Sequence, residues 1–193
     1  MRVLGSGSDE EFVAVFLRGE IASPRYRETV LAELDRRGLD RALVDTPHLE
    51  SDLENNQRAA VLLAYRPLIV DDDVFGHWPP DVDWQSVEFD LDEVGNFHFL
   101  TYSYWDELSS GTHLVRDGAE SVRAGRVVFG VHNDMFWQIA QSIDAGKQLP
   151  PLIALDRGPD LRPLLIEGHN RATGLLLAMN PPTTIKALLA IRR

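Results

Sequence analysis

The chain contains no cysteine among its 193 residues. This excludes disulfide scaffolds, zinc sites with thiolate ligands, iron–sulfur clusters and every enzyme with a cysteine nucleophile. It also lacks an apolar run of about 18 residues, which a membrane span needs, and it lacks the apolar stretch of a signal peptide. We therefore expect a cytoplasmic protein. Its 14 glycines, 11 prolines and 44% hydrophobic residues are ordinary for a globular chain, so collagen, long coiled coils and wholesale disorder are excluded as well.

Positive charge is scarce, since 19 Lys and Arg stand against 30 Asp and Glu, a formal net charge of −11. A surface of this sign repels a phosphate backbone, which disfavours extended nucleic-acid binding. From residue 157 to the last residue the balance reverses, because Asp160 and Glu167 stand against six basic residues: Arg157, Arg162, Arg171, Lys186, Arg192 and Arg193. This locally positive segment suits a small anionic ligand better than a duplex.

Helix signals dominate the first third of the chain. Ser8 and Glu11 have capping-box spacing and predict a first helix. Similar opening and closing signals predict two more helices: Ser23-Pro24 to Gly38, and Thr46-Pro47 to about Arg66.

After residue 67 the spacing of apolar residues shortens. Runs at residues 84–91 and 97–100 flank Gly95-Asn96, which predicts two antiparallel strands. Short helices are expected at residues 104–108 and 116–124. Asn133 predicts the start of a stronger helix that ends near Ala145.

The last fifty residues show the most regular pattern. Short apolar runs predict strands at Leu152–Leu155, Leu164–Ile166 and Ile185–Ile191, with a helix at His169–Met179 whose Leu175 and Leu176 pack on the sheet. We therefore expect an α+β fold with a mostly helical N-terminal part and a C-terminal mixed sheet with packed helices. The expected parts are residues 1–67, 68–130 and 131–193, either separate or within one compact domain.

The sharpest functional signal is the turn Glu167-Gly168-His169-Asn170-Arg171, where a strand runs through a glycine into a helix. The amides of a first helical turn and the helix dipole favour an anion, and Gly168 lets a ligand approach the backbone. Arg171 can act as a bidentate fork for a phosphate. The expected phosphate-binding residues are Gly168, His169, Asn170, Arg171 and Thr173.

Glu167, at the end of the expected strand, can hold a magnesium ion or accept a proton from a hydroxyl nucleophile. The alternative is a capped surface helix on which Arg171 pairs with Glu167 one turn away.

This turn resembles the ParB/sulfiredoxin-like superfamily. In that family a hydrophobic strand runs into a Gly-x-x-Arg turn at the start of a helix, where nucleotide phosphates bind, and Gly168 to Arg171 fit this pattern. The helix, glycine and proline-led strand around Ile143 to Ile153 are also similar to the family. The resemblance covers residues 131–191, about a third of the chain.

Departures within the superfamily narrow the expected activity. Sulfiredoxins need a cysteine in the turn, and ParB proteins of chromosome partition carry a helix-turn-helix domain after the last strand, which we do not expect here. The most similar turn is the Asp-Gly-His-Thr-Arg of the free serine kinases, from which this chain differs by Glu167 and Asn170. The resemblance implies ATP or ADP with Mg²⁺ as cofactors, a small-molecule acceptor, and Glu167 and His169 as catalytic residues.

We predict a nucleotide-binding small-molecule phosphotransferase (kinase) or ATPase, with the phosphates held from Gly168 to Arg171. The alternative is a non-catalytic, nucleotide-sensing regulatory or interaction protein, with the helical N-terminal third as its partner surface. A nuclease-like enzyme is disfavoured by the net charge of −11. Asp71-Asp72-Asp73 is a weaker metal candidate, more typical of a solvated loop. The aromatic residues around Trp84 and Trp105 are more typical of core packing than of a substrate cavity.

Overall fold

The computed structural model describes residues 1–23, 25–72 and 74–193, and the chain divides into two compact units. The sheet unit comprises residues 1–5 and 85–192, and the helical unit comprises residues 6–84 together with Arg193. The prediction of an α+β fold with a mixed sheet is confirmed. Within the described ranges, no helix combines the length and the apolarity needed to cross a bilayer.

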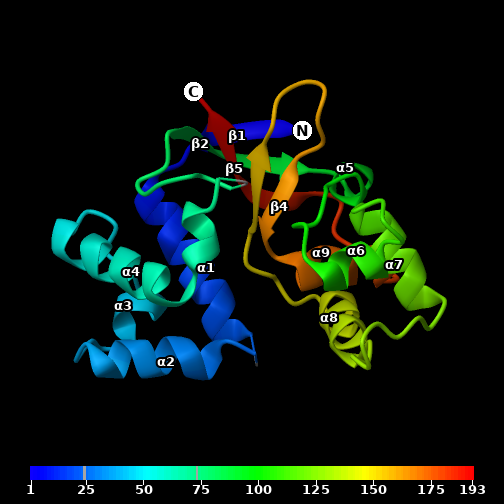
Figure 1. Ribbon diagram of the computed structural model, residues 1–193, viewed down its shortest axis with the longest axis horizontal. Coiled ribbons are helices and arrows are strands. Elements are labelled where there is room, and N and C mark those ends of the chain that lie inside the picture. The colour runs from blue at the N-terminus through cyan, green and yellow to red at the C-terminus, as the bar shows by residue number, and fades with distance from the viewer. Residues whose placement is uncertain (24, 73) are drawn as a thin grey trace. The chain divides into compact units, whose positions relative to one another are not determined.

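The helical unit is built around its first helix, α1, which contacts α2, α3 and α4 (Figure 1). Its elements are α1 (Asp9–Ala22), α2 (Arg27–Arg36), α3 (Ala42–Asp45), α4 (Asp52–Tyr65) and the 3-10 helix η1 (Pro67–Val70). The capping prediction for α1 is confirmed, because Ser8 Oγ accepts a hydrogen bond from the Glu11 amide at 3.2 Å. Gly38 adopts a φ of +65° just after α2, as expected for a helix end.

One expected helix start is wrong, and another falls on a residue outside the described ranges. α2 begins at Arg27 after Tyr26, and the predicted Pro24 start lies outside the described residues. α4 begins after Ser51, whose hydroxyl accepts from the Glu54 amide at 3.4 Å. Thr46-Pro47 therefore precedes the helix. Thr46 follows the last residue of α3, and its hydroxyl donates to the carbonyl of Ala42, the first residue of α3.

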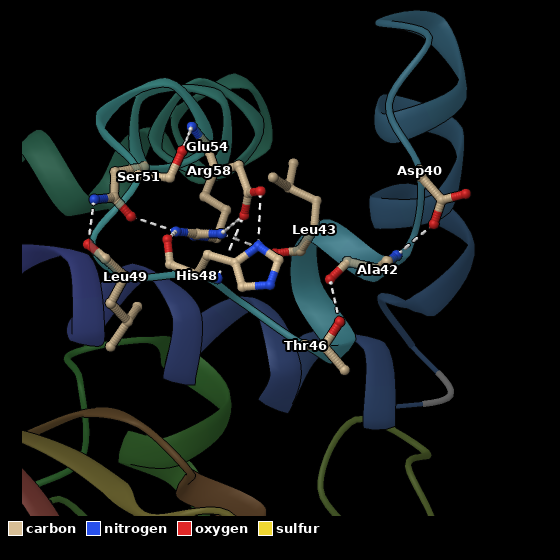
Figure 2. Close-up of polar contacts among 10 residues, drawn as sticks. Asp40, Ala42, Leu43, Thr46, His48, Leu49, Ser51, Glu54 and Arg58 are labelled. Carbon is tan, nitrogen blue, oxygen red and sulfur yellow. Dashed lines mark hydrogen bonds and ion pairs between the residues drawn. The ribbon is translucent and has the colours of Figure 1, made fainter.

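A fully buried arginine joins α4 to the segment that leads into it (Figure 2). Arg58 donates through Nη1 to the Leu43 carbonyl at 3.1 Å and through Nη2 to the His48 carbonyl at 3.1 Å. The same guanidinium also bonds to Glu54 and Asn55 on its own helix. Arg58 thus supplies hydrogen-bond donors to carbonyl groups that no regular element satisfies.

Aromatic side chains fill the core of the helical unit. The ring of Phe12 stacks on Trp84 with centroids 4.8 Å apart, and Phe16 and Phe75 contact Phe12 edge-on. The indole Nε1 of Trp84 donates to the Asp9 carboxylate at 2.6 Å. Trp84, which belongs to the aromatic residues for which the sequence predicted core packing, is thus buried among these rings.

The sheet unit contains a five-stranded mixed sheet in the order β1-β2-β5-β3-β4 (Figure 1). The strands are β1 (Arg2–Ser6), β2 (Val82–Phe89), β3 (Leu152–Asp156), β4 (Leu164–Glu167) and β5 (Ile185–Arg192). β3 runs antiparallel to β4 and parallel to β5, with Leu152 opposite Ala187 and Asp156 opposite Ile191. The three strands predicted in the last fifty residues are confirmed, whereas β1 was not predicted.

Helices of the sheet unit include α5 (Leu91–Gly95), α6 (Ser103–Leu108), α7 (Val115–Arg123), α8 (Asp134–Asp144) and α9 (His169–Leu177). Leu175 of α9 lies in one buried cluster with Leu152, Leu165 and Leu189 of the sheet, and Leu176 packs at its edge, as predicted. α8 approaches α9 closely, because a Cβ at Gly174 would meet Ile139 Cγ2 at 2.4 Å.

The predicted hairpin around Gly95-Asn96 is wrong. Its first strand exists as β2, but the chain then enters α5, where Asp90 and Glu93 form a complete capping box. The second predicted strand is reduced to a single residue, His98, which bridges to Leu164 and to Leu114. The capping bonds therefore start a helix where the apolar pattern predicted a turn.

Candidate functional site

The turn between β4 and α9 has the backbone geometry that the sequence predicted. Gly168 has a φ of +101° and is the N-cap of α9, with no side chain capping the helix. The first amide bonded within the helix is that of Ala172, which donates to the Gly168 carbonyl at 2.8 Å. The preceding amides of the first turn have no partner inside the helix, so they present partial positive charge at this end.

Arg171 lies over this glycine and is largely buried, with a side chain 12% exposed. A Cβ on Gly168 would meet Arg171 Nη2 at 3.1 Å and Leu152 Cδ2 at 2.6 Å, so only glycine leaves room for both neighbours. Nη2 donates to the Pro151 carbonyl at 3.1 Å. Nε is buried and has no hydrogen-bond partner in the part of the chain that the structure describes.

Glu167 and Arg171 form the ion pair that the alternative interpretation expected. Arg171 Nη1 donates to Glu167 Oε1 at 3.3 Å, and the glutamate side chain is 14% exposed. The pair is therefore mostly buried, unlike a solvated surface pair. In this arrangement Oε1 of the Glu167 carboxylate is bonded to a cation.

His169 lies in a stack of aromatic rings. Its ring is nearly parallel to those of Trp105 and Phe99, with centroid distances of 5.1 and 5.8 Å. Nε2 accepts a hydrogen bond from the Leu100 amide at 3.3 Å, so Nε2 carries no proton when this bond is made. The backbone of His169 lies in the first turn of α9, where an anion is favoured. Its ring contacts Phe99 and the Leu100 amide, which lie in the segment before α6.

The remaining predicted residues of the turn point elsewhere. Asn170 Nδ2 donates weakly to the sulfur of Met135 in α8, at 3.6 Å. Thr173 is fully buried, and its hydroxyl donates to the His169 carbonyl at 3.0 Å. The structure thus brings Glu167, Gly168 and Arg171 together and does not bring Thr173 to the turn.

The weaker metal candidate gains no support. Asp71 and Asp72 are exposed, and the third residue of the run, Asp73, lies outside the described residues. Among residues 1–23, 25–72 and 74–193, no group of three or more His, Asp or Glu side chains is arranged to hold a metal ion.

Sequence reasoning missed a second cationic group, formed by His98, Arg157 and Arg162 in the sheet unit. Arg157 Nη2 lies 2.9 Å from His98 Nδ1, and Arg162 Nη1 donates to Asn96 Oδ1 at 2.5 Å. Burial, followed by the charge of Arg157, lowers the pKa of His98 below its ordinary value of 6.5. The sequence placed the two arginines in a positive segment, but 59 positions separate His98 from Arg157 and no local pattern joins them.

Comparisons of the chain with protein-family models, with curated proteins and with solved structures give no match.

Proposed function

We propose that the start of α9 binds the phosphates of a nucleotide or a similar phosphorylated small molecule, and that the protein is a phosphotransferase or ATPase. The observation that carries this proposal is the placement of Arg171 over Gly168. A buried guanidinium with an unpaired Nε lies beside uncapped helix amides, and all of these groups are donors. Donors of this kind, converging on a helix start, favour a phosphate.

The order β3, β4, α9, β5 and the left-handed Gly168 also support a ParB/sulfiredoxin-like fold for residues 131–193. This finer fold assignment stays a proposal, as does the expected cytoplasmic location.

Phosphate binding and base activation are coupled through Arg171 in this proposal. A phosphate that takes the Nη1 and Nε donors of Arg171 displaces the Glu167 carboxylate from its partner. The released carboxylate can then accept the proton of an acceptor hydroxyl or water. The acceptor oxygen forms a bond to the terminal phosphorus, the bond from phosphorus to the nucleoside diphosphate breaks, and the diphosphate leaves.

A magnesium ion fits this turn only as a companion of the nucleotide. Mg²⁺ in nucleotide sites is commonly held by one or two carboxylates together with phosphate oxygens and water. Glu167 supplies one carboxylate, and the described residues offer no cluster that would hold a resident ion without the nucleotide. Such an ion would neutralise phosphate charge beside Glu167.

The second candidate is a nucleotide-sensing protein without catalysis. The ion pair between Glu167 and Arg171 favours this candidate, because the Glu167 carboxylate is bonded to Arg171. The ring of His169 is stacked on Trp105, so neither side chain stands in a catalytic arrangement. In this case nucleotide binding opens the pair between Glu167 and Arg171, and that change is the signal.

Titration of the purified chain with ATP, ADP and CTP, each with and without magnesium, tests both candidates. Calorimetry measures binding, and a phosphate-release assay measures turnover. Saturable binding with turnover supports the phosphotransferase or ATPase, and saturable binding without turnover supports the sensor. If none of the three nucleotides binds, both proposals are wrong.

A further inference from the structure

A set of basic residues gathers at the opposite end of the sheet from Gly168. β3 and β5 are parallel, and Asp156 pairs with Ile191. Arg157 and Arg192 therefore follow at the carboxyl ends of two adjacent parallel strands. Ligands in α/β sheets commonly bind beyond the carboxyl ends of parallel strands, where loops carry the binding groups.

The contacts of Arg157 and Arg162 leave their charge uncompensated. Arg157 donates through Nε and Nη2 to the Arg162 carbonyl, at 3.0 and 2.8 Å. Arg162 donates to the amide oxygen of Asn96. Within the described residues neither guanidinium has a carboxylate partner, although the chain carries 30 Asp and Glu. Two acids lie in or beside the β3–β4 connection, Asp156 and the exposed Asp160, and Asp156 accepts from the Gly158 amide at 2.9 Å.

His98 completes the set in a neutral form. A guanidinium can only donate, so the 2.9 Å contact between Arg157 Nη2 and His98 Nδ1 requires an unprotonated Nδ1. The charged groups that face His98 are Arg157 and Arg162 from the β3–β4 connection and His113 from the segment before α7. His113 in turn pairs with Asp106 of α6 at 3.3 Å.

We propose that His98, Arg157 and Arg162, with Arg192 beside them, form a second anion site for the dianionic phosphoryl group of a small molecule. Arg157 Nη1 and the Nε and Nη2 edge of Arg162 are not used in the contacts above and can donate to phosphate oxygens. His98 can take up a proton at Nδ1 when the arriving anion draws Arg157 Nη2 away from it. The negative charge of the chain as a whole favours a compact dianion over a long polyanion.

This site is separate from the start of α9. Arg171 bonds to Pro151 just before β3, and Arg157 follows the end of that strand, so roughly 20 Å of extended chain separates them. Reacting atoms must approach to about 3–3.5 Å, so the second site does not hold the acceptor for a transfer at Glu167. The inference therefore stands or fails independently of the proposed function.

Nuclear magnetic resonance titration of the full chain with sodium sulfate, and then with inorganic phosphate, tests the site. Sodium chloride at equal ionic strength gives the baseline. We expect saturable shifts at His98 and in the β3–β4 connection. Arg157→Gln and the exposed Arg162→Gln should each weaken sulfate binding by about tenfold or more, as the loss of a charge-assisted hydrogen bond predicts.

Arg36→Gln is the matched control, because it removes the same charge from a guanidinium that is paired with Glu33 in the helical unit. It should change the sulfate affinity measured from the His98 shifts less than twofold. Equal weakening by Arg36→Gln and Arg162→Gln would show a general charge effect and overturn the site. If Arg171→Ala abolishes the sulfate shifts at His98, these shifts come from binding at the start of α9, and the second site is overturned. Tighter binding of a DNA duplex than of phosphate would also overturn it.

The pH dependence gives a second, independent readout. Sulfate stays a dianion from pH 8 to pH 5.5, so any change in its affinity reports on protein groups. A bound dianion offsets the neighbouring cations and raises the pKa of His98, and each unit of that rise strengthens binding at low pH by up to about tenfold. His98→Gln should remove this pH dependence. If wild-type affinity does not depend on pH, His98 has no part in the site.

Discussion

Leu152 packs directly against Gly168, so that a Cβ added to the glycine would meet Leu152 Cδ2 at 2.6 Å. The contact joins the first residue of β3 to the residue that connects β4 with α9. Gly168 also has a φ of +101°, where side chains other than hydrogen are strained. Two constraints, one of space and one of backbone conformation, therefore require glycine at the turn under Arg171.

Gly168→Ala should be more destabilising than Gly158→Ala. Gly158 has a similar φ of +98° with nothing within 4 Å of an added Cβ, so its substitution costs only backbone strain, about 1–2 kcal/mol. Gly168→Ala adds the overlap with Leu152, a further cost of about 1–3 kcal/mol. Urea unfolding of both variants measures the difference. Equal losses of stability would show that Leu152 moves aside without cost.

Arg171 and Glu167 should separate nucleotide binding from catalysis. Arg171→Ala should weaken nucleotide binding roughly ten- to 150-fold, because it removes a charge-assisted phosphate donor. Glu167→Gln should leave affinity within a few fold and lower turnover by about 10², the usual scale for a general base. Calorimetry and phosphate release measure the two effects. Arg41→Ala, which removes an exposed arginine paired with Asp45 four residues away, is the control.

Wild-type turnover in Glu167→Gln would contradict the enzyme proposal and leave the binding proposal intact. Unchanged nucleotide affinity in Arg171→Ala would contradict both.

Arg58→Met should destabilise the helical unit strongly. The substitution fills much of the same volume but leaves the Leu43 carbonyl without the donor that Arg58 supplies, and the His48 carbonyl keeps only its bond from the Ser51 amide. Removal of one partner from a buried charged network typically costs about 3–5 kcal/mol. Arg41→Met, at an exposed arginine, should change stability by about 0.5 kcal/mol or less. Chemical denaturation followed by circular dichroism compares them, and similar values for both would show that Arg58 is dispensable.

The acid dependence of stability should include a contribution from Glu33. Hydrogen bonds from Arg36 and then from Arg37 lower the pKa of Glu33 from 4.5 to about 2 in the folded chain. A carboxylate with a lowered folded pKa stabilises the fold above its unfolded pKa. This contribution is lost as the pH falls from 4.5 through about 2. Carbon-13 nuclear magnetic resonance of the Glu33 carboxyl measures its midpoint.

Glu33→Gln should lower the free energy of unfolding near neutral pH, and the difference from wild type should shrink below pH 4.5. A difference that stays constant between pH 7 and pH 3 would show that the charge of Glu33 is not its source.

Local signals allowed the C-terminal elements to be predicted from the sequence. The apolar runs at Leu152–Leu155 and Leu164–Ile166 are bounded by turn residues, and Gly168 marks the start of α9. Two errors elsewhere have one cause: Ser51 with Glu54, and Asp90 with Glu93, have the same capping-box spacing as Ser8 with Glu11. The chain starts α4 at Ser51 with Glu54 and not at Thr46-Pro47, and it starts α5 at Asp90 with Glu93 where the apolar pattern predicted a hairpin.

The parts that the sequence did not reveal depend on distant residues. β1 is exposed along its whole length and has no alternating apolar pattern, so only its pairing with β2 makes it a strand. Arg171 has one local partner and one distant partner. Glu167 lies one helical turn away and could be expected from the sequence, whereas Pro151 is 20 residues away and could not. The contact of His98 with Arg157 is entirely non-local.

The central position of β5 has a consequence for synthesis on the ribosome. β5 lies between β2 and β3, yet it is the last of the strands to be translated. Helices α1 to α4 emerge early and make local contacts, whereas β2 and β3 must wait with open edges until residues 185–192 leave the exit tunnel. Non-local strand pairing is slow, and open strand edges favour aggregation. Until β5 pairs with both β2 and β3, the open edges of these two strands are therefore the part of the nascent chain most exposed to edge-to-edge aggregation.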